Sequence, residues 1–551
     1  MSLDTALASL AATLGLLSTG GCNPLWGLDQ LSYDGAGANG GNGPCEPGLV
    51  RECYSGPAAT QGVGSCRAGT ETCLESGTSF GPCQDEVTPG LETCGPGGGD
   101  TDCDGRLCGD TLWALRFGGA GDEVALGVAS DSDGNVLCTG YYQTGTNFGP
   151  QPADALPDAS GSDRHGFVAK LGPNGDYRWS VPMVGPGSAG YDVAVDPAGN
   201  VYVVGLCDGA VAIGGTAVTC NAVSDVLVLK LDPDGAVLWA RGYGGTGGDA
   251  GRAVAVIPDG GIAVVGAIAG AVDLGGGPLA SAGGLDVFVA LYDADGNHLA
   301  SKSFGSAGDD DAWAVAVDAA GNLTLAGTFR GSFNLFAPAV ACDPDCPDAW
   351  IAQLGPGLAV SWAQAWRGPG AQRIYDIASA PDGNLLVAGS FETSLLLPSE
   401  TLNGQPDDDL FLAKLSPTGA DDVWDHTISA ADLGQQRATS VAVAPDGSIT
   451  LGGYFQTTLA LTGVPALTGS GERNRFVARF APDGTALQAR SFVLGSAQSN
   501  PLDVVPGWVA LAVDPGGFPL LGSFFDGVWD AGGNGLASAG AADGVVLKLQ
   551  R

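Results

Sequence analysis

The chain has 551 residues, more than one ordinary hydrophobic core organises, so several domains or a repeat array are expected. Glycine accounts for 92 residues, a content that favours short strands and tight turns, and no amphipathic helix is found after residue 20. The 60 acidic and 22 basic residues give a formal net charge of −38, which disfavours nucleic acid and anionic membranes as partners and favours cations or basic partners.

Residues 1–21 form an apolar stretch that is too short to span a bilayer and ends in small residues before Cys22. The stretch resembles a bacterial lipoprotein signal with residues 19–22 in the place of the lipobox, which implies cleavage before Cys22 and lipid attachment to its thiol. An ordinary secretory signal and a short anchor helix are the alternatives. All three interpretations export the chain, and the lipoprotein one attaches it to the outer membrane or cell surface.

Two short segments follow the signal. Residues 22–44 form a Gly-rich tether without side chains for a core. Residues 45–110 are predicted to form a disulfide-stapled module, whose connectivity stays open because eight cysteines allow 105 pairings. Its cysteines are Cys45, Cys53, Cys66, Cys73, Cys83, Cys94, Cys103 and Cys108.

Other cysteines lie in the larger region that follows. Cys207 with Cys220, and Cys342 with Cys346, are expected to close loops by disulfide bonds. Cys138 is expected to be a buried thiol in a strand. Cysteine use on this scale agrees with an exported protein, because disulfides persist in oxidising compartments.

A motif with a turn glycine recurs seven times after residue 112, with spacings of 61 to 70 residues. The turn glycines are Gly134, Gly199, Gly260, Gly321, Gly383, Gly447 and Gly517. Alternating apolar residues and Asp/Pro/Gly turns divide each repeat into four strands. In one repeat these are predicted at 191–196, 200–205, 225–231 and 236–242.

The order of the strands predicts a closed ring. An outer strand at 112–117 precedes the first inner strand, and the chain ends on a third strand at 545–549. Pairing these two segments leaves no free edge, so residues 112–551 are predicted to form an all-β, seven-bladed propeller of four-stranded antiparallel blades. Triplets such as Val193-Ala194-Val195 place Val on one side of a blade and Ala on the other, which lets neighbouring blades interlock.

Stretches such as WALRFGGAGDEVALGVASDSDGNVLCTGYY and HGFVAKLGPNG resemble the bacterial β-propeller repeat family labelled SBBP, over roughly residues 112–551. The cysteine module, with CYSGPAATQGVGSCRAGTETC and ETCGPGGGDTDCDG, is similar to a Cys-rich motif of myxobacterial surface proteins that is sometimes described as metal-binding. Both resemblances imply a cell-surface location, and neither brings a defined catalytic activity. The inserts between second and third strands and the links between blades are expected on one face, where a ligand site would lie.

Carboxylates ahead of the inner strands are candidate metal ligands. They are expected to converge on the mouth of the central channel and to share Ca²⁺, the alternative being that they cap turn amides. The set comprises Asp122, Asp192, Asp249 and Asp311, and a second cluster in the cysteine module comprises Asp100, Asp102 and Asp104. Asp-x-Asp-Gly segments at 131–134, 232–235 and 293–296 lack the glutamate of a calcium loop and are predicted to be β-turns.

Catalysis has little support in the sequence. His165, His298 and His426 fall in different repeats, so they predict neither a metal triad nor a nucleophile pair. The segment 231–239 resembles a motif of pyrroloquinoline-quinone dehydrogenases that ends in tryptophan, the alternative being that such tryptophans pack between blades. The sequence therefore predicts a monomeric, non-catalytic scaffold that binds a surface protein or a glycan. A quinone-dependent dehydrogenase or a cation-dependent polysaccharide-active enzyme is the alternative.

Overall fold

The computed structural model describes residues 45–55, 61–62, 66–88, 111–149, 151, 154–157, 164–221, 223–336, 339–342, 347–419, 422–428, 434–469, 473–492, 508–530, 535–539 and 541–551. These residues fall into two compact units, 45–88 and 111–551, and each is described by itself. No helix of the described residues has the length and apolar character needed to cross a membrane.

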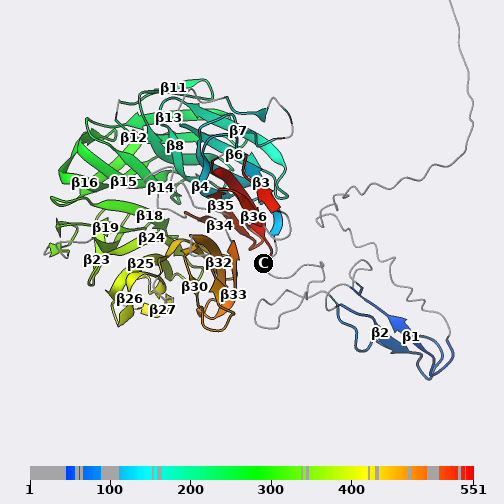
Figure 1. Ribbon diagram of the computed structural model, residues 1–551. Coiled ribbons are helices and arrows are strands. Elements are labelled where there is room, and N and C mark those ends of the chain that lie inside the picture. The colour runs from blue at the N-terminus through cyan, green and yellow to red at the C-terminus, as the bar shows by residue number, and fades with distance from the viewer. Residues whose placement is uncertain are drawn as a thin grey trace, which may run out of the picture. The chain divides into compact units, whose positions relative to one another are not determined.

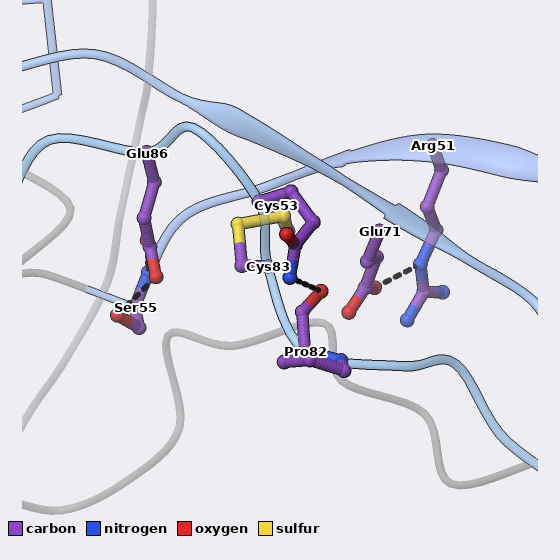
Figure 2. Close-up of a disulfide and its surroundings, with 8 residues drawn as sticks. Arg51, Cys53, Ser55, Glu71, Pro82, Cys83 and Glu86 are labelled. Carbon is purple, nitrogen blue, oxygen red and sulfur yellow. Dashed lines mark hydrogen bonds and ion pairs between the residues drawn. A yellow bond between two sulfur atoms is a disulfide. The ribbon is translucent and has the colours of Figure 1, made fainter.

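The cysteine module is built on a two-stranded hairpin of β1 (Val50–Cys53) and β2 (Gly69–Thr72). Disulfides join Cys45 to Cys73 and Cys53 to Cys83, and Cys66 is also disulfide-bonded. Figure 2 shows the second bridge between two ionic or hydrogen-bonded pairs, in which Arg51 contacts Glu71 at 2.5 Å and Ser55 Oγ donates to Glu86 at 2.8 Å. The predicted disulfide framework is therefore present in this part of the module.

Residues 111–551 form seven four-stranded antiparallel blades (Figure 1). The inner strands of blades 1 to 7 are β4 (Glu123–Ser130), β8 (Ala189–Val195), β14 (Ala250–Val256), β18 (Asp311–Val317), β24 (Gln372–Ser379), β28 (Gln436–Val443) and β34 (Ala510–Val513). The second strands are β5 (Val136–Tyr142), β9 (Val201–Cys207), β15 (Ile262–Asp273), β19 (Leu323–Phe329), β25 (Leu385–Leu396), β29 (Ile449–Phe455) and β35 (Pro519–Phe525).

The third and fourth strands complete the blades. The third strands are β6 (His165–Leu171), β12 (Asp225–Leu231), β16 (Pro278–Tyr292), β22 (Asp348–Leu354), β26 (Thr401–Leu415), β32 (Asn474–Phe480) and β38 (Asp543–Leu549). The outer strands are β7 (Tyr177–Val184), β13 (Val237–Tyr243), β17 (His298–Phe304), β23 (Val360–Trp366), β27 (Asp422–Ile428), β33 (Ala486–Phe492) and β3 (Thr111–Phe117). The predicted strands of the example repeat lie within one or two residues of these bounds.

The ring closes as the sequence predicts. Strand β3, the first of the propeller, is the outer strand of blade 7 and pairs antiparallel with β38, with Ala114 opposite Leu547 (Figure 1). Blade 7 is therefore built from both ends of the propeller, and its outer edge is occupied by a strand from the beginning of the chain.

Each blade packs its small side against the bulky side of the next. Ala314 and Ala316 of blade 4 belong to one buried cluster with Ile377 of blade 5, whereas Val315 and Val317 pack on a cluster shared with blade 3. The alternation of the inner strand thus divides its residues between two interblade cores.

A second contact joins neighbouring blades at their turns. In blade 1, the Lys170 ammonium and the Trp179 indole N–H both donate to the Pro233 carbonyl of blade 2, at 3.2 and 3.0 Å. In blade 7 the same roles fall to Lys548 of β38 and Trp113 of β3, which are directly opposite each other and share the Pro173 carbonyl of blade 1. The closing blade is held like the others, although its two donors come from opposite ends of the propeller.

The inserts after the second strands form hairpins. In blades 3 and 5 the hairpins are extensions of β15–β16 and β25–β26, and short additional pairs occur in other blades. The short pairs are β10 (Ala210–Ile213) with β11 (Thr216–Thr219), β20 (Ser332–Phe333) with β21 (Val340–Ala341), β30 (Thr458–Leu459) with β31 (Leu467–Thr468), and β36 (Val528–Asp530) with β37 (Gly535–Ala537).

The cysteines of the propeller follow the prediction with one correction. Cys207 and Cys220 form a disulfide, and Cys138 is a free, buried thiol. Cys342 is also free, so the expected bond to Cys346, which lies outside the described residues, is not formed. The Cys342 N–H instead continues the hairpin by donating to the Gly331 carbonyl, and its sulfur accepts the Gly331 N–H.

Candidate functional site

A β-bulge interrupts the inner strand in six of the seven blades. In each, one residue is inserted opposite the second strand, and the residues inserted are Leu126, Tyr191, Arg252, Trp313, Tyr375 and Thr439. Each of them, together with the residue that follows it, lines one cavity on the ring axis. A bulge bends its strand and re-aims side chains, so the same local irregularity, repeated around the ring, builds the central cavity.

Four consecutive blades contribute large side chains to this cavity, which we call the aromatic wall: Tyr191, Arg252, Trp313 and Tyr375. The Arg252 guanidinium lies 4.7 Å from the centre of the Trp313 ring and 5.4 Å from that of Tyr191. The Trp313 and Tyr375 rings meet edge to face at 6.4 Å. The wall is thus a continuous series of contacts across blades 2 to 5.

Two carboxylates occupy the position directly after the bulge. Asp192 accepts the N–H of Val193 at 2.8 Å and that of Val254, in the next blade, at 2.9 Å. Asp376 in blade 5 repeats the arrangement, accepting the Val441 N–H and the Ser440 hydroxyl of blade 6, each at 2.8 Å. Each carboxylate therefore links two inner strands where they face the cavity.

These carboxylates are partly buried, and both line the cavity. Burial raises the pKa of the Asp192 carboxyl to about 7 and that of the Asp376 carboxyl to about 6. The amide donors oppose this rise, and the negative charge of Asp376 adds to it at Asp192. The charge of Asp376 in blade 5 thus acts on the carboxyl of Asp192 in blade 2.

The cavity has a volume of about 660 Å³, within the range of small-molecule and cofactor pockets. Its lining includes Ser224 and Leu285 at the ends of inserts and Gly248 at a link between blades. The cavity therefore reaches the face that carries the links and inserts, which is the face on which the sequence predicts a ligand site.

The four acids predicted to converge on the channel mouth have separate partners. Asp192 and Asp249 both line the cavity, and Asp249 accepts the N–H groups of Gly245 and Ala269. Asp311 pairs with Arg252 at 3.1 Å, and Asp122 accepts the Ala542 N–H at 3.2 Å.

The structure thus places two of the four predicted acids at the central cavity, and the binding of Ca²⁺ stays a prediction. Within the part of the chain that the structure describes, no three His, Cys, Asp or Glu side chains are close enough to hold a metal ion together. The four acids stand at different positions relative to the bulge, so their side chains leave the strands in different directions. Asp100, Asp102 and Asp104 lie outside the described residues, as do Cys22, Cys94, Cys103 and Cys108.

The true equivalents of Asp249 are residues that the sequence prediction missed. Glu123 accepts the Gly119 N–H and the Thr144 N–H, and Asp310 accepts the Ser306 N–H and the Arg330 N–H. In all three cases the carboxylate bonds an amide four residues earlier and an amide two residues beyond the point where the second strand stops pairing with the inner strand. That spacing of four from the start of the link is the signal that identifies them as loop caps.

The remaining predicted groups have structural roles. Asp131 accepts two N–H groups of its own turn at 3.0 and 2.9 Å, as expected for an Asp-x-Asp-Gly β-turn. His165 contacts the Gly185 carbonyl and His298 contacts Ser301 on its own outer strand, in different blades. The side chain of His426 is not among those described.

The tryptophans that resemble a dehydrogenase motif pack between blades. The Trp239 indole donates to the Ala294 carbonyl of blade 3 and covers Gly296, where an added Cβ would lie 2.8 Å from the ring. Gly296 has a positive φ of 77°, so the turn needs glycine for its conformation as well as for this close approach. Trp179 covers Gly235 in the same way.

The chain is by its structure a seven-bladed β-propeller, and comparisons add little beyond that class. No protein-family model matches it. An uncharacterized WD repeat-containing protein of Acanthamoeba polyphaga mimivirus is 24% identical over 157 residues, which are 26% of this chain and 11% of that protein. The chain thus spans about a tenth of the length of this relative. The resemblance to SBBP repeats stays a prediction.

Among solved structures, the WD40 repeats of RRP9 are 10% identical with a TM-score of 0.43, covering 80% of this chain and 99% of that one. Quinohemoprotein alcohol dehydrogenase from Comamonas testosteroni is 11% identical with a TM-score of 0.37, covering 80% and 76%. YCF48 with a bound peptide is 9% identical with a TM-score of 0.35, covering 84% and 99%. Likenesses this distant say nothing of function.

Proposed function

We propose that this protein is an exported, monomeric cell-surface scaffold that binds a surface protein or a glycan in the central cavity of its propeller and does not transform it. The observation that carries the proposal is the set of six bulges that turn an aromatic wall and two carboxylates toward one cavity of about 660 Å³. A bulge bends its strand and interrupts the regular pairing with the neighbouring strand. Bulges at the same position in six inner strands are therefore explained best by a role in shaping the cavity.

Export is supported by the three disulfides Cys45–Cys73, Cys53–Cys83 and Cys207–Cys220, since such bonds persist in oxidising compartments. Lipid attachment at Cys22 belongs to the same proposal. It predicts that the mature protein begins at Cys22, partitions into detergent and carries acyl chains, and that Cys22→Ser abolishes all three properties in a mass-spectrometric and labelling experiment.

Binding is tested with the mature protein and two tryptophan variants. Trp313→Ala removes a ring from the cavity, and Trp179→Ala removes one from an outer strand. Partners captured from a cell-surface fraction, and hits from a glycan panel, should be lost at least tenfold with Trp313→Ala and kept with Trp179→Ala. Equal retention by both variants would contradict a site in the cavity.

The enzyme alternative makes a different prediction. A quinone-dependent dehydrogenase would purify with a visible chromophore or gain dye-linked alcohol oxidation on addition of the quinone. The scaffold proposal expects neither, and expects bound ligands to be recovered unchanged in mass. A chromophore or a modified ligand would replace the proposal by the alternative.

A further inference from the structure

In the central cavity a positive side chain has an ion-pair partner, whereas two negative side chains have none. Arg252, the one cation of the aromatic wall, is neutralised by Asp311 at 3.1 Å. Asp192 and Asp376 form no ion pair with any lysine or arginine of the described residues. Arg373 and Arg437 lie near Tyr375, but both are bound to Asp408 and neither lines the cavity.

A buried carboxylate without a cationic partner is unfavourable, and backbone N–H donors compensate only part of the lost hydration. The raised pKa values of Asp192 and Asp376 express this deficit, because burial outweighs the amide bonds at both groups. A cation placed between the two carboxylates would relieve it. The cavity thus has a deficit of positive charge at the same level as its aromatic wall.

The wall itself is suited to a cation. Trp313 and Tyr191 already hold the Arg252 guanidinium within 5.4 Å of their ring centres, which is the distance range of cation–π attraction. Trp508, from blade 7, adds an aromatic side chain to the lining on another side. Rings on several sides of a concave site strengthen attraction to a cation, because a cation that enters it leaves part of its water behind.

We propose that the cavity binds a lysine or arginine side chain presented by an exposed segment of a partner protein, with the cation between Asp192 and Asp376 and its alkyl stem against Trp313. The inference rests on the proposed binding function and names its ligand. The net charge of −38 attracts a basic partner to this protein and disfavours an acidic one.

A protein segment is favoured over a free polyamine by the surroundings of the cavity. Ala269 of β15 and Leu285 of β16 belong to its lining, and the same two strands continue outward as a long hairpin. The hairpin β25–β26 extends from blade 5 in the same way. These hairpins offer a partner further contact area that a small cation would not use.

The test is calorimetric titration of the full mature protein with the peptide acetyl-Gly-Gly-Arg-Gly-Gly-amide. Its matched control has citrulline in place of arginine, which keeps the shape and removes the charge. We expect the arginine peptide to bind at least tenfold more tightly than the citrulline peptide, and to lose at least fivefold in affinity between 0.05 and 0.5 M salt. Equal binding of the two peptides, or no binding of either at millimolar concentration, overturns the inference.

Substitutions in the cavity test whether the peptide binds there. Asp376→Asn and Trp313→Leu should each weaken arginine-peptide binding at least tenfold, and Asp295→Asn, an exposed aspartate of a β-turn, should not. Trp313→Leu keeps an apolar side chain and guards against a loss of folding in Asp376→Asn. Unchanged affinity in both cavity variants overturns the inference.

Two further outcomes test the assigned ligand separately from the proposed binding function. Spermidine that binds as tightly as the arginine peptide would assign the site to small polyamines and overturn the choice of a protein segment. If the peptide fails while natural partners are still captured in a Trp313-dependent way, the binding function stands and the cationic ligand falls.

Discussion

The cysteine module and the propeller reach stability by different means. In the described residues of the module, the buried hydrophobic side chains are Cys66 and Cys73, and the disulfides Cys45–Cys73 and Cys53–Cys83 join residues 28 and 30 positions apart. The propeller instead has a buried hydrophobic cluster at each interface between blades, and one disulfide in its second blade. A small unit with little apolar burial depends on covalent links, whereas a closed ring depends on each blade covering the next.

The largest effect is expected from weakening the contact between blade 7 and blade 1, where the ring closes. Phe117 of β3 is 1% exposed and packs on Phe148 at 4.5 Å and Phe167 at 5.2 Å, so it joins blade 7 to blade 1. Phe117→Ala should lower the unfolding free energy of the propeller by about 5 kcal/mol. Tryptophan fluorescence in urea measures this change, because residues 45–88 contain no tryptophan. The proteolysis rate of the cysteine module should stay the same.

Two buried lysines allow the contact that closes the ring, between blades 7 and 1, to be compared with an ordinary contact between blades. Lys548 and Lys414 each pair with an aspartate at 2.7 Å, but the Asp514 side chain is 6% exposed and that of Asp382 is 48% exposed. Lys548→Met leaves a buried charge unpaired and should cost about 3 kcal/mol. Lys414→Met leaves a hydrated charge and should cost about 1 kcal/mol. Equal losses in urea unfolding would show that burial of the acid does not decide the effect.

The module should respond to loss of its bridges without the propeller. The double substitution Cys45→Ser and Cys73→Ser should destabilise the module by about 2 kcal/mol and speed tryptic cleavage at Arg51 and Arg67 about thirtyfold. The fluorescence melting of the propeller should not change. Cys342→Ser, which removes a free thiol, is the control and should alter neither measurement.

The smallest effect is expected in the pH dependence of propeller stability, because two carboxyl groups of the cavity stabilise the folded state at acid pH. Asp192 and Asp376 bind a proton more tightly in the folded chain, with pKa values of about 7 and about 6, than in the unfolded chain. Their contribution to stability is therefore present below the unfolded pKa and is lost as the pH rises toward 7. Wild type should lose about 1 kcal/mol relative to Asp192→Asn between pH 6 and pH 7. Parallel stability curves would contradict this assignment.

The architecture follows from local sequence signals. The seven turn glycines count the blades, and the position of 112–117 before any inner strand predicts the closing pair that Trp113 and Lys548 form. The Val-Ala-Val triplets predict which sides of neighbouring blades meet. These features depend on the alternation and order of strands, which the sequence carries directly.

The lining of the cavity was decided by the tertiary structure. The sequence assigns Asp122, Asp192, Asp249 and Asp311 to one place, but only Asp192 and Asp249 of the four line the cavity, together with Asp376. A bulge adds one residue to a strand, and the apolar pattern of the sequence does not mark its position. A shift of one residue moves every following side chain to the other face of the strand. Blade number and closure could thus be predicted from the sequence alone, whereas the choice of Tyr191, Trp313 and Tyr375 for the wall required the geometry of the folded ring.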